Sequence, residues 1–558
     1  MNILLVDGLV LLNSLRGAGH NVLHFSPSGM DRVCVPQVLA EHNFTPDIIL
    51  QSENLARRIL LEGLPQVRCP KMFWAIDSHL NLYWHRYYAR LFDAVLTPHP
   101  SLWQALPEEW RHPEVHHFTK PGQARPFKPH AERSRQLCLV GVLNKHRYLR
   151  LRLAELLKER WGVEAMQNVP FREMLDMYDD TRIIPNESIA REVNFRLMEA
   201  ASCGAVPLTQ DVGPDQDSLF EPGREILVYR DAAEMVGHIE ALLANPARAE
   251  AIGRAAWERV QLEHLPAHRV AQIEGLAARL AGRPAGQAGR TAGALVVAPR
   301  RESPDEVGSE AILWLCRVQM HRSWHVESRP EFLLAAGAGL PQTPEILAYR
   351  LRLLAEYDGA AAVAPFLEQI LAQKQHPDSL DLNLVGSLIA ARAGDQPLAL
   401  QFWLRQTLYG QSRQKPPAAQ ALARPDNAHD LCLAWADLLN KAGRKAQLGL
   451  TVNIATGIPE CAWTALLLAE ALPREQIPFD DLPRLKKIEA LSAGIKGLEF
   501  YHLGYLAQLC LALPDDWRLQ MRYAEACLQT FRLEQGLLER AEAERKRQES
   551  RKKGEGRK

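Results

Sequence analysis

One segment of the sequence combines a predicted helix start with charged residues suited to nucleotide binding. A buried strand ending near Ile184 leads into a polar loop, a helix from about Val193, a stop at Gly204 and another strand over 206–208. The first N–H groups of a helix are free and carry the positive end of its dipole, so they can hold a diphosphate. Glu199 lies about one and a half turns into this helix. Its carboxylate would accept hydrogen bonds from ribose hydroxyls, as acidic residues do in other nucleotide-binding α/β folds.

The elements around this segment follow a βα pattern over the first 280 or so residues. Short apolar runs predict strands at 3–6, 21–25, 47–50, 72–75 and 94–97, and again at 137–141, 182–184, 206–208 and 226–229. Amphipathic stretches between them predict helices packed on parallel sheets. We therefore expect two tandem Rossmann-like domains, at 1–118 and 136–281, joined by a Pro-containing connector at 119–135.

The second half of the chain is predicted to be helical. Residues 282–308, rich in Gly, Ala, Arg and Pro, are expected to form a linker. Over 309–540 strand signals are almost absent, and turns recur at Asp358-Gly359, Gly394-Asp395 and Gly443-Arg444. This spacing resembles degenerate tetratricopeptide-type hairpins, whose period is about 34 residues, with a generic helical bundle as the alternative. Residues 541–558 form a basic tail.

Composition excludes several classes of protein. The chain has 558 residues, a formal net charge of zero and nine Cys, none in a Cys-x-x-Cys pair. Neither a disulfide framework nor a structural zinc site is expected. The charge balance argues against a protein that covers nucleic acid with its whole surface. No apolar run is long enough to span a membrane, and the N-terminus reads as a strand rather than a signal peptide. We therefore expect a cytoplasmic protein with no specific nucleic-acid partner.

The motif around the predicted helix resembles a known family. The residues Asn194-x-Arg196-x-x-Glu199-Ala200-x-x-Cys203-Gly204, followed by the runs at 220–226 and 229–231, are similar to the C-terminal half of group 1 glycosyltransferases with the GT-B fold. The branch with CgeB-like proteins is the most similar, and the runs at 19–22, 74–79 and 92–93 resemble its N-terminal half. The resemblance covers residues 1 to about 280 and does not reach the helical region.

This resemblance implies transfer of a sugar, of the hexosyl type, from a nucleotide-sugar bound mainly by the second domain. By motif position Glu199 would bind the donor ribose, and Asn194 and Arg196 would flank the diphosphate or the sugar. The first domain would hold the acceptor. Repeat hairpins form concave surfaces suited to peptides, so the helical region is expected to recruit a protein acceptor or partner.

The same resemblance implies that cations meet the donor phosphates at the start of the second domain. The candidates there are Gly141, Lys145, Arg147 and Arg150. A leaving nucleoside diphosphate develops negative charge, which Lys, Arg and helix dipoles stabilise without a metal. No Asp-x-Asp motif stands out in a suitable loop, so we expect a metal-independent enzyme with no cofactor besides its donor substrate.

The chain departs from the family pattern at one acidic position. Retaining members carry Glu-x7-Glu, but Arg191 stands eight residues before Glu199, and Glu192 is one position off. Retaining and inverting chemistry therefore both stay open. An inverting reaction needs a general base, for which Asp77 and His79 are the candidates, although Asp77 could instead cap the helix expected from Leu80. The displaced Glu also leaves an alternative: a non-catalytic scaffold built on a degenerate transferase fold.

Overall fold

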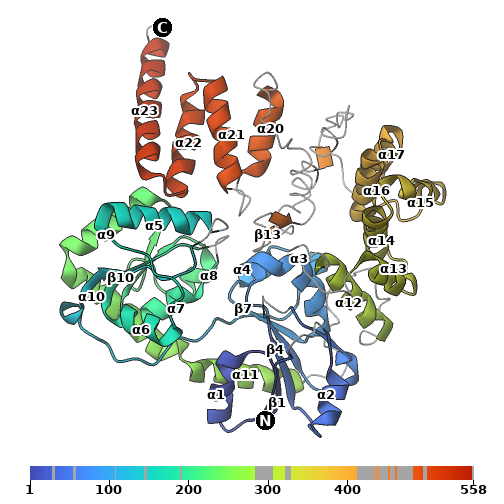
Figure 1. Cartoon of the computed structure of the whole chain (residues 1–558), viewed down its shortest axis with the longest axis horizontal. Helices are drawn as coiled ribbons and strands as arrows, with labels where there is room; N and C mark the ends of the chain where they lie inside the picture. Colours follow the sequence, from blue (N-terminus) through green and yellow to red (C-terminus); the bar gives the residue numbers. More distant parts are fainter. Residues whose placement is uncertain are drawn as a thin grey trace.

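The computed structural model has two α/β lobes followed by a helical region (Figure 1). It describes residues 1–27, 32–54, 58–106, 108–143, 147–188, 192–282, 306–320, 329–410, 431, 434–435, 438, 450–452, 459–461, 482–493 and 499–555. Within these residues, no helix has both the length and the apolar composition needed to cross a lipid bilayer.

The first lobe is built on a six-stranded parallel sheet with the order β2-β1-β4-β6-β7-β8. Its strands are β1 (Asn2–Val6), β2 (Asn21–Phe25), β4 (Ile48–Ser52), β6 (Lys71–Trp74), β7 (Ala94–Thr97) and β8 (Val115–His117). All residues of β4 and β7 are buried, as expected for a parallel sheet with helices on both faces. The helices are α1 (Leu9–Gly17), α2 (Val35–Glu41), α3 (Ser78–Tyr88) and α4 (Pro100–Gln104). The five predicted strands are confirmed, and β8 extends the sheet.

Two short strands, β3 (Arg32–Cys34) and β5 (Leu60–Glu62), form a separate parallel pair beside this sheet. The sequence analysis did not predict them, because runs of three residues carry little periodicity. After β8 the predicted connector is mostly irregular, with a single 3₁₀ turn at His130–Glu132.

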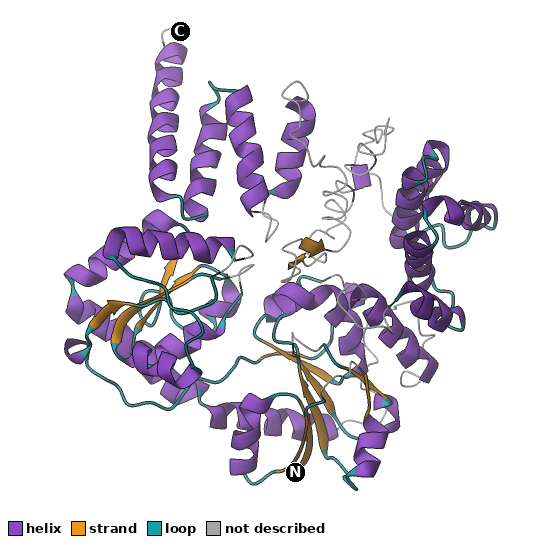
Figure 2. Cartoon of the chain, viewed as in Figure 1, coloured by secondary structure: helices purple, strands orange, loops and turns teal. Residues whose placement is uncertain are grey.

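The second lobe is built on a parallel sheet with the order β12-β11-β10-β9. Its strands are β9 (Arg135–Leu137), β10 (Thr181–Asn186), β11 (Val206–Gln210) and β12 (Leu227–Tyr229). Its helices are α5 (Tyr148–Trp161), α6 (Phe171–Asp179), α7 (Phe195–Ser202), α8 (Pro214–Asp217), α9 (Ala232–Ala244) and α10 (Pro246–Arg259). Only the first residue of the strand predicted over 137–141, Leu137, lies in β9. Beyond it, Val140 pairs with Met166 in an isolated bridge rather than with β10. Figure 2 shows helices around the strands of both lobes.

The last helix of the predicted second domain, α11 (Pro266–Ala281), packs on the first lobe. Its Val270, Ile273 and Leu276 belong to the apolar core that contains Leu11 and Leu15 of α1. Burying this face against α1 removes apolar surface from water, which stabilises the packing by about 25 cal/mol per Å² of buried apolar surface. The two lobes are therefore joined by two chain crossings, the connector and the segment leading into α11.

The helical region lies beyond both lobes. Its helices are α12 (Glu306–Met320), α13 (Pro330–Ala338), α14 (Pro344–Tyr357), α15 (Ala360–Ala372), α16 (Leu380–Arg392), α17 (Gln396–Gly410), α20 (Leu482–Ser492), α21 (Glu499–Ala512), α22 (Trp517–Gln529) and α23 (Leu533–Glu555). The predicted turns at 358–359 and 394–395 join α14 to α15 and α16 to α17, with Gly359 and Gly394 at positive φ. The turn predicted at 443–444 and most of the predicted linker, 283–305, lie outside the described residues.

Short strands β13 (Leu450–Val452) and β14 (Pro459–Cys461) form an antiparallel pair within this region, which the sequence did not suggest. The region touches both lobes. On the first lobe, α12 packs against α3, and Cys316 Sγ lies 3.9 Å from the Trp84 carbonyl oxygen. On the second lobe, Leu528 and Phe531 join the core beneath α5 and α9.

Candidate functional site

A cavity of about 470 Å³ lies between the two lobes. Every predicted site residue that the structure describes lines it: Asp77, His79, Gly141, Arg147, Arg150, Asn194, Arg196 and Glu199. Lys145 lies outside the described residues. The lobes also touch near this cavity, because Asp215 of α8 accepts a hydrogen bond from the Ser101 N–H at 3.0 Å.

The start of α7 is held by side-chain hydrogen bonds rather than by a capping bond. Asn194 is the N-cap residue, but its side chain makes no cap hydrogen bond. Its Nδ2 instead donates to Asn186 Oδ1 at 2.8 Å and to the Glu187 carbonyl oxygen at 3.0 Å. Asn194 is therefore tied to the end of β10, and a capping role for its side chain is excluded.

Arg196 is a buried residue, not a surface salt-bridge partner. Its guanidinium donates to Asn186 Oδ1 at 3.0 Å and to the Val140 carbonyl oxygen at 2.6 Å, and the residue is 8% exposed. These bonds join α7 to the chain that follows β9. A guanidinium held this way is pre-oriented, so it loses little entropy when an anion reaches it.

Gly141 makes room for two guanidinium groups. A Cβ at this position would lie 2.7 Å from Arg196 Nη2 and 3.2 Å from Arg150 Nη1. Arg150 is also buried, and its Nε donates to Glu187 Oε2 at 2.9 Å. Burial, together with the nearby positive charge of Arg196, lowers the pKa of Arg150. A phosphate in the cavity would relieve this repulsion.

Glu199 faces the cavity from α7, with its side chain 14% exposed. Its Oε1 lies 3.6 Å from the ammonium of Lys120, which sits 4.4 Å from the ring centroid of Phe195 and 5.0 Å from that of Phe171. The sequence analysis did not select Lys120. The residue belongs to the connector, and only the fold brings that segment to α7.

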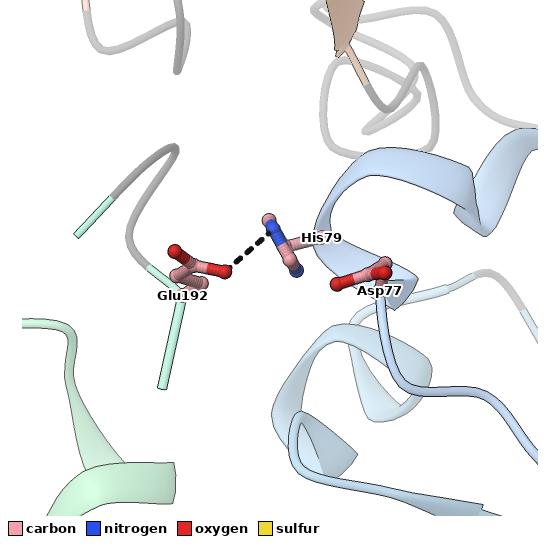
Figure 3. Close-up of side chains that lie close together, drawn as sticks. All are labelled: Asp77, His79 and Glu192. Carbon is pink, nitrogen blue, oxygen red and sulfur yellow. Dashed lines mark ion pairs between the residues drawn. The ribbon is translucent and has the colours of Figure 1, made fainter. Parts of the chain in front are cut away.

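The first lobe contributes Asp77 and His79 from the start of α3 (Figure 3). The Asp77 side chain makes no cap hydrogen bond, so it does not act as the helix cap. His79 Nε2 lies 3.2 Å from Glu192 Oε2 of the second lobe. Glu192 is therefore a site residue that the sequence analysis noted but did not select, and its signal was the acidic pattern displaced by one position.

The carboxyl group of Asp77 has a strongly perturbed pKa. Burial, and then the neighbouring Glu53 carboxylate, raise this pKa to about 7. Glu192 adds to the rise, whereas His79 and Arg147 oppose it. A carboxylate with a pKa near neutral pH is well matched to general-base catalysis.

His79 and Glu192 shift one another in opposite directions. Burial lowers the pKa of His79, but the hydrogen bond and charge of Glu192 outweigh it, so the net pKa is raised. Burial raises the pKa of Glu192, and the imidazole outweighs it in turn, so that pKa is lowered. Each side chain therefore favours the charged form of the other, and the two face each other across the two lobes.

Glu53 binds the backbone of Asp77 and the side chains next to it. Its Oε2 accepts a hydrogen bond from the Asp77 backbone N–H at 2.7 Å, and its Oε1 accepts one from Asn81 Nδ2 at 2.6 Å. His85 Nε2 lies 3.1 Å from the same Oε1. Glu53 is buried at the end of β4, and nothing in its local sequence distinguishes it.

We expect Glu53→Gln to move the acidic limb of the kcat profile to lower pH by about one unit. If Asp77 serves as the base, kcat falls as the pH drops through the pKa of its carboxyl group. Removing the Glu53 charge lowers that pKa. The control is Glu53→Asp, which keeps the charge and should keep the limb near its wild-type position; equal shifts in both variants would contradict the electrostatic role.

Asp77, His79 and Glu192 also carry oxygen and nitrogen atoms within 4.8 Å of one another. Such donor types suit a divalent cation. In this arrangement His79 Nε2 lies 3.2 Å from Glu192 Oε2, so it would compete with a cation for that carboxylate. The second lobe contributes basic side chains, including those of Arg147 and Arg150, to the same cavity.

Comparison with known proteins bears on this site. Residues 125–275 match a family model described as glycosyl transferase-like. No curated protein matches the chain. Similar solved structures include a sucrose-phosphate synthase from Thermosynechococcus elongatus, with 14% identity and a TM-score of 0.39 over 50% of this chain and 99% of that one.

Two further similar structures contain bound sugar and nucleotide. Anabaena HepE in complex with UDP and glucose is 14% identical, with a TM-score of 0.37 over 50% of this chain and all of its own. The pneumococcal O-GlcNAc transferase GtfA in complex with UDP and GlcNAc is 12% identical, with a TM-score of 0.32 over 45% of this chain and 60% of its own. The residues matched by the glycosyl transferase-like model, 125–275, include most of the second lobe and the cavity residues Arg150, Arg196 and Glu199.

Proposed function

We propose that the protein is a metal-independent glycosyltransferase that moves a hexose from a nucleotide-sugar to an acceptor hydroxyl. One observation carries the proposal: a single cavity between the lobes has two buried arginines, Arg150 and Arg196, on one wall and Asp77 with His79 on the other. Its volume, about 470 Å³, lies within the range of small-molecule sites.

The second lobe would hold the donor. Arg150 and Arg196, with the start of α7, would face the diphosphate, and Arg147 would lie at its edge. Glu199 would accept hydrogen bonds from the ribose hydroxyls, and Lys120 would orient this carboxylate. As the bond to the sugar breaks, these fixed cations would stabilise the negative charge that develops on the leaving nucleoside diphosphate.

The first lobe would hold the acceptor. Asp77 would take the proton from the acceptor hydroxyl, because its raised pKa lets it accept a proton near neutral pH. This role places the reaction among inverting displacements, in which the deprotonated oxygen attacks the anomeric carbon opposite the leaving group. His79, paired with Glu192, would hold the two lobes around the reacting atoms.

We also propose a cytoplasmic location and a protein acceptor recruited by the helical region. The cysteines whose side chains the structure describes are free thiols, and most of them are buried, as expected in a reducing compartment. The helical region packs beside α3, the helix whose first turn carries His79. A protein bound there would be close to the acceptor wall of the cavity.

A thermal-shift screen with UDP, GDP, dTDP and ADP tests the donor proposal. A ligand that binds only the folded state raises the melting temperature, so we expect one nucleotide at about 100 times its Kd to stabilise the protein by about 2.7 kcal/mol. The shift should persist in EDTA, because the arginines rather than a metal would neutralise the diphosphate. No shift with any nucleotide would favour the non-catalytic scaffold, and loss of the shift in EDTA would contradict metal independence.

A further inference from the structure

The turn between α22 and α23 is inserted into the second lobe. Leu528, Phe531 and Leu533 are buried in the same apolar core as Leu157 of α5 and Met235 of α9. Phe531 adopts a left-handed backbone conformation, with φ of 58°, which is costly for a bulky residue. Such a conformation persists where the surrounding packing fixes it, so this turn is a part of the lobe rather than a loose attachment.

One contact leads from this turn to the arginines of the cavity. Arg532 donates to the Tyr148 hydroxyl oxygen from Nη2 at 2.8 Å and from Nε at 3.2 Å. Tyr148 is the first residue of α5, and it lies between Arg147 and Arg150, which both line the cavity. The position of the first turn of α5 therefore depends in part on Arg532.

A second contact leads to the other arginine. The ring of Phe531 meets that of Tyr229 edge to face, with centroids 6.2 Å apart. The Tyr229 hydroxyl donates to the Asn186 carbonyl oxygen at 2.8 Å, and the Asn186 side chain accepts from Arg196. The first contact therefore reaches the helix turn that carries Arg147 and Arg150. The second reaches Arg196, which lines the same cavity.

We propose that the helical region positions the donor-binding arginines through Arg532 and Phe531. This inference rests on the proposed function of the cavity. The two residues are positioning residues, because neither lines the cavity between the lobes. The donor site is then completed by the last helices of the chain, and the helical region has a role in donor binding that is separate from any recruitment of an acceptor.

The test uses the full chain and the nucleoside diphosphate that gives the largest thermal shift. Calorimetry is expected to show a Kd raised about fivefold to tenfold for Arg532→Met and for Tyr148→Phe. The double variant should be no weaker than the poorer single variant, because both changes remove the same contact. The donor KM should rise likewise, while kcat at saturating donor stays within about twofold of wild type. Arg532→Lys, which can still donate to the hydroxyl, should recover part of the affinity.

Arg518→Ala is the matched control, because Arg518 is an exposed arginine of α22 that contacts Trp517 of its own helix. It should leave the Kd unchanged. Unchanged Kd values in Arg532→Met and Tyr148→Phe would overturn the inference. Tyr148→Phe removes only one oxygen atom, so it remains informative if Arg532→Met fails to fold.

Amide hydrogen exchange separates this inference from the proposed function. Without nucleotide, exchange over 151–154, the first amides of α5 with helical hydrogen bonds, should be about tenfold faster in Arg532→Met than in Arg518→Ala. If wild type binds no nucleotide, the proposed function fails, and this exchange result still decides whether the turn holds α5. Equal exchange in the two variants would contradict the positioning role.

Discussion

Replacing Asp77 with Asn should lower kcat by about 10²- to 10⁴-fold, the range expected when a general base is removed. Asparagine has nearly the same shape but cannot accept the acceptor proton. The donor Kd should change by less than about threefold, because Asp77 lies on the wall opposite the arginines. Steady-state kinetics with saturating donor, together with calorimetric binding of the nucleoside diphosphate, check this result.

The same substitution should make the protein more stable above pH 7. Because the pKa of Asp77 is raised on folding, its ionised form is less favourable in the folded chain than in the unfolded chain. Its contribution therefore becomes unfavourable as the pH rises from the unfolded pKa through about 7, and Asn removes this cost. If the Asp77→Asn protein lost both activity and stability at pH 8, the loss of activity would reflect misfolding rather than removal of the general base.

Replacing Glu199 with Ala should raise the donor Kd and KM by about 10- to 100-fold. A carboxylate that accepts hydrogen bonds from ribose hydroxyls would make charge-assisted bonds, which are stronger than neutral ones. The loss should be smaller when the donor lacks a ribose 2′-hydroxyl, because one of these bonds is then absent in wild type as well. Calorimetric titration with the ribo and 2′-deoxy forms of the same nucleotide measures the difference.

Glu173→Ala is the control for this prediction, since Glu173 is an exposed carboxylate in the first turn of α6. It should leave the Kd within about twofold of wild type. Equal losses for the two nucleotide forms in Glu199→Ala would contradict ribose binding, even if affinity falls. That outcome would assign Glu199 to the support of Lys120 instead.

The order of the elements and one wall of the cavity could be predicted from the sequence. Buried strands such as β1 and β7 are mostly apolar runs, and Gly204 follows α7 at a positive φ that glycine adopts readily. The short motif from Asn194 to Glu199 lies within one loop and one helix. Local spacing was therefore sufficient to place these residues in the same site.

Residues brought in by long-range packing could not be predicted in this way. Glu53 reaches the Asp77 backbone from β4, which precedes it by 24 residues, and Arg532 reaches Tyr148 across 384 residues. Lys120 meets Glu199 only because the connector passes beside α7. Glu192 meets His79 only because the two lobes pack against each other. Such contacts depend on tertiary structure, for which hydrophobic periodicity carries no signal. The helix α11 is a similar case: its amphipathic pattern predicts a helix but not the lobe on which it packs.

The most direct test of the central claim is the release of nucleoside diphosphate from a panel of nucleotide-sugars by the full chain in EDTA, with water as the acceptor of the sugar. We expect one donor to be consumed, with release reduced at least 100-fold in Asp77→Asn at saturating donor and restored in Glu199→Ala when the donor concentration is raised. If wild type consumes no donor, or if Asp77→Asn releases nucleoside diphosphate at the wild-type rate, the cavity is not the transferase site described above.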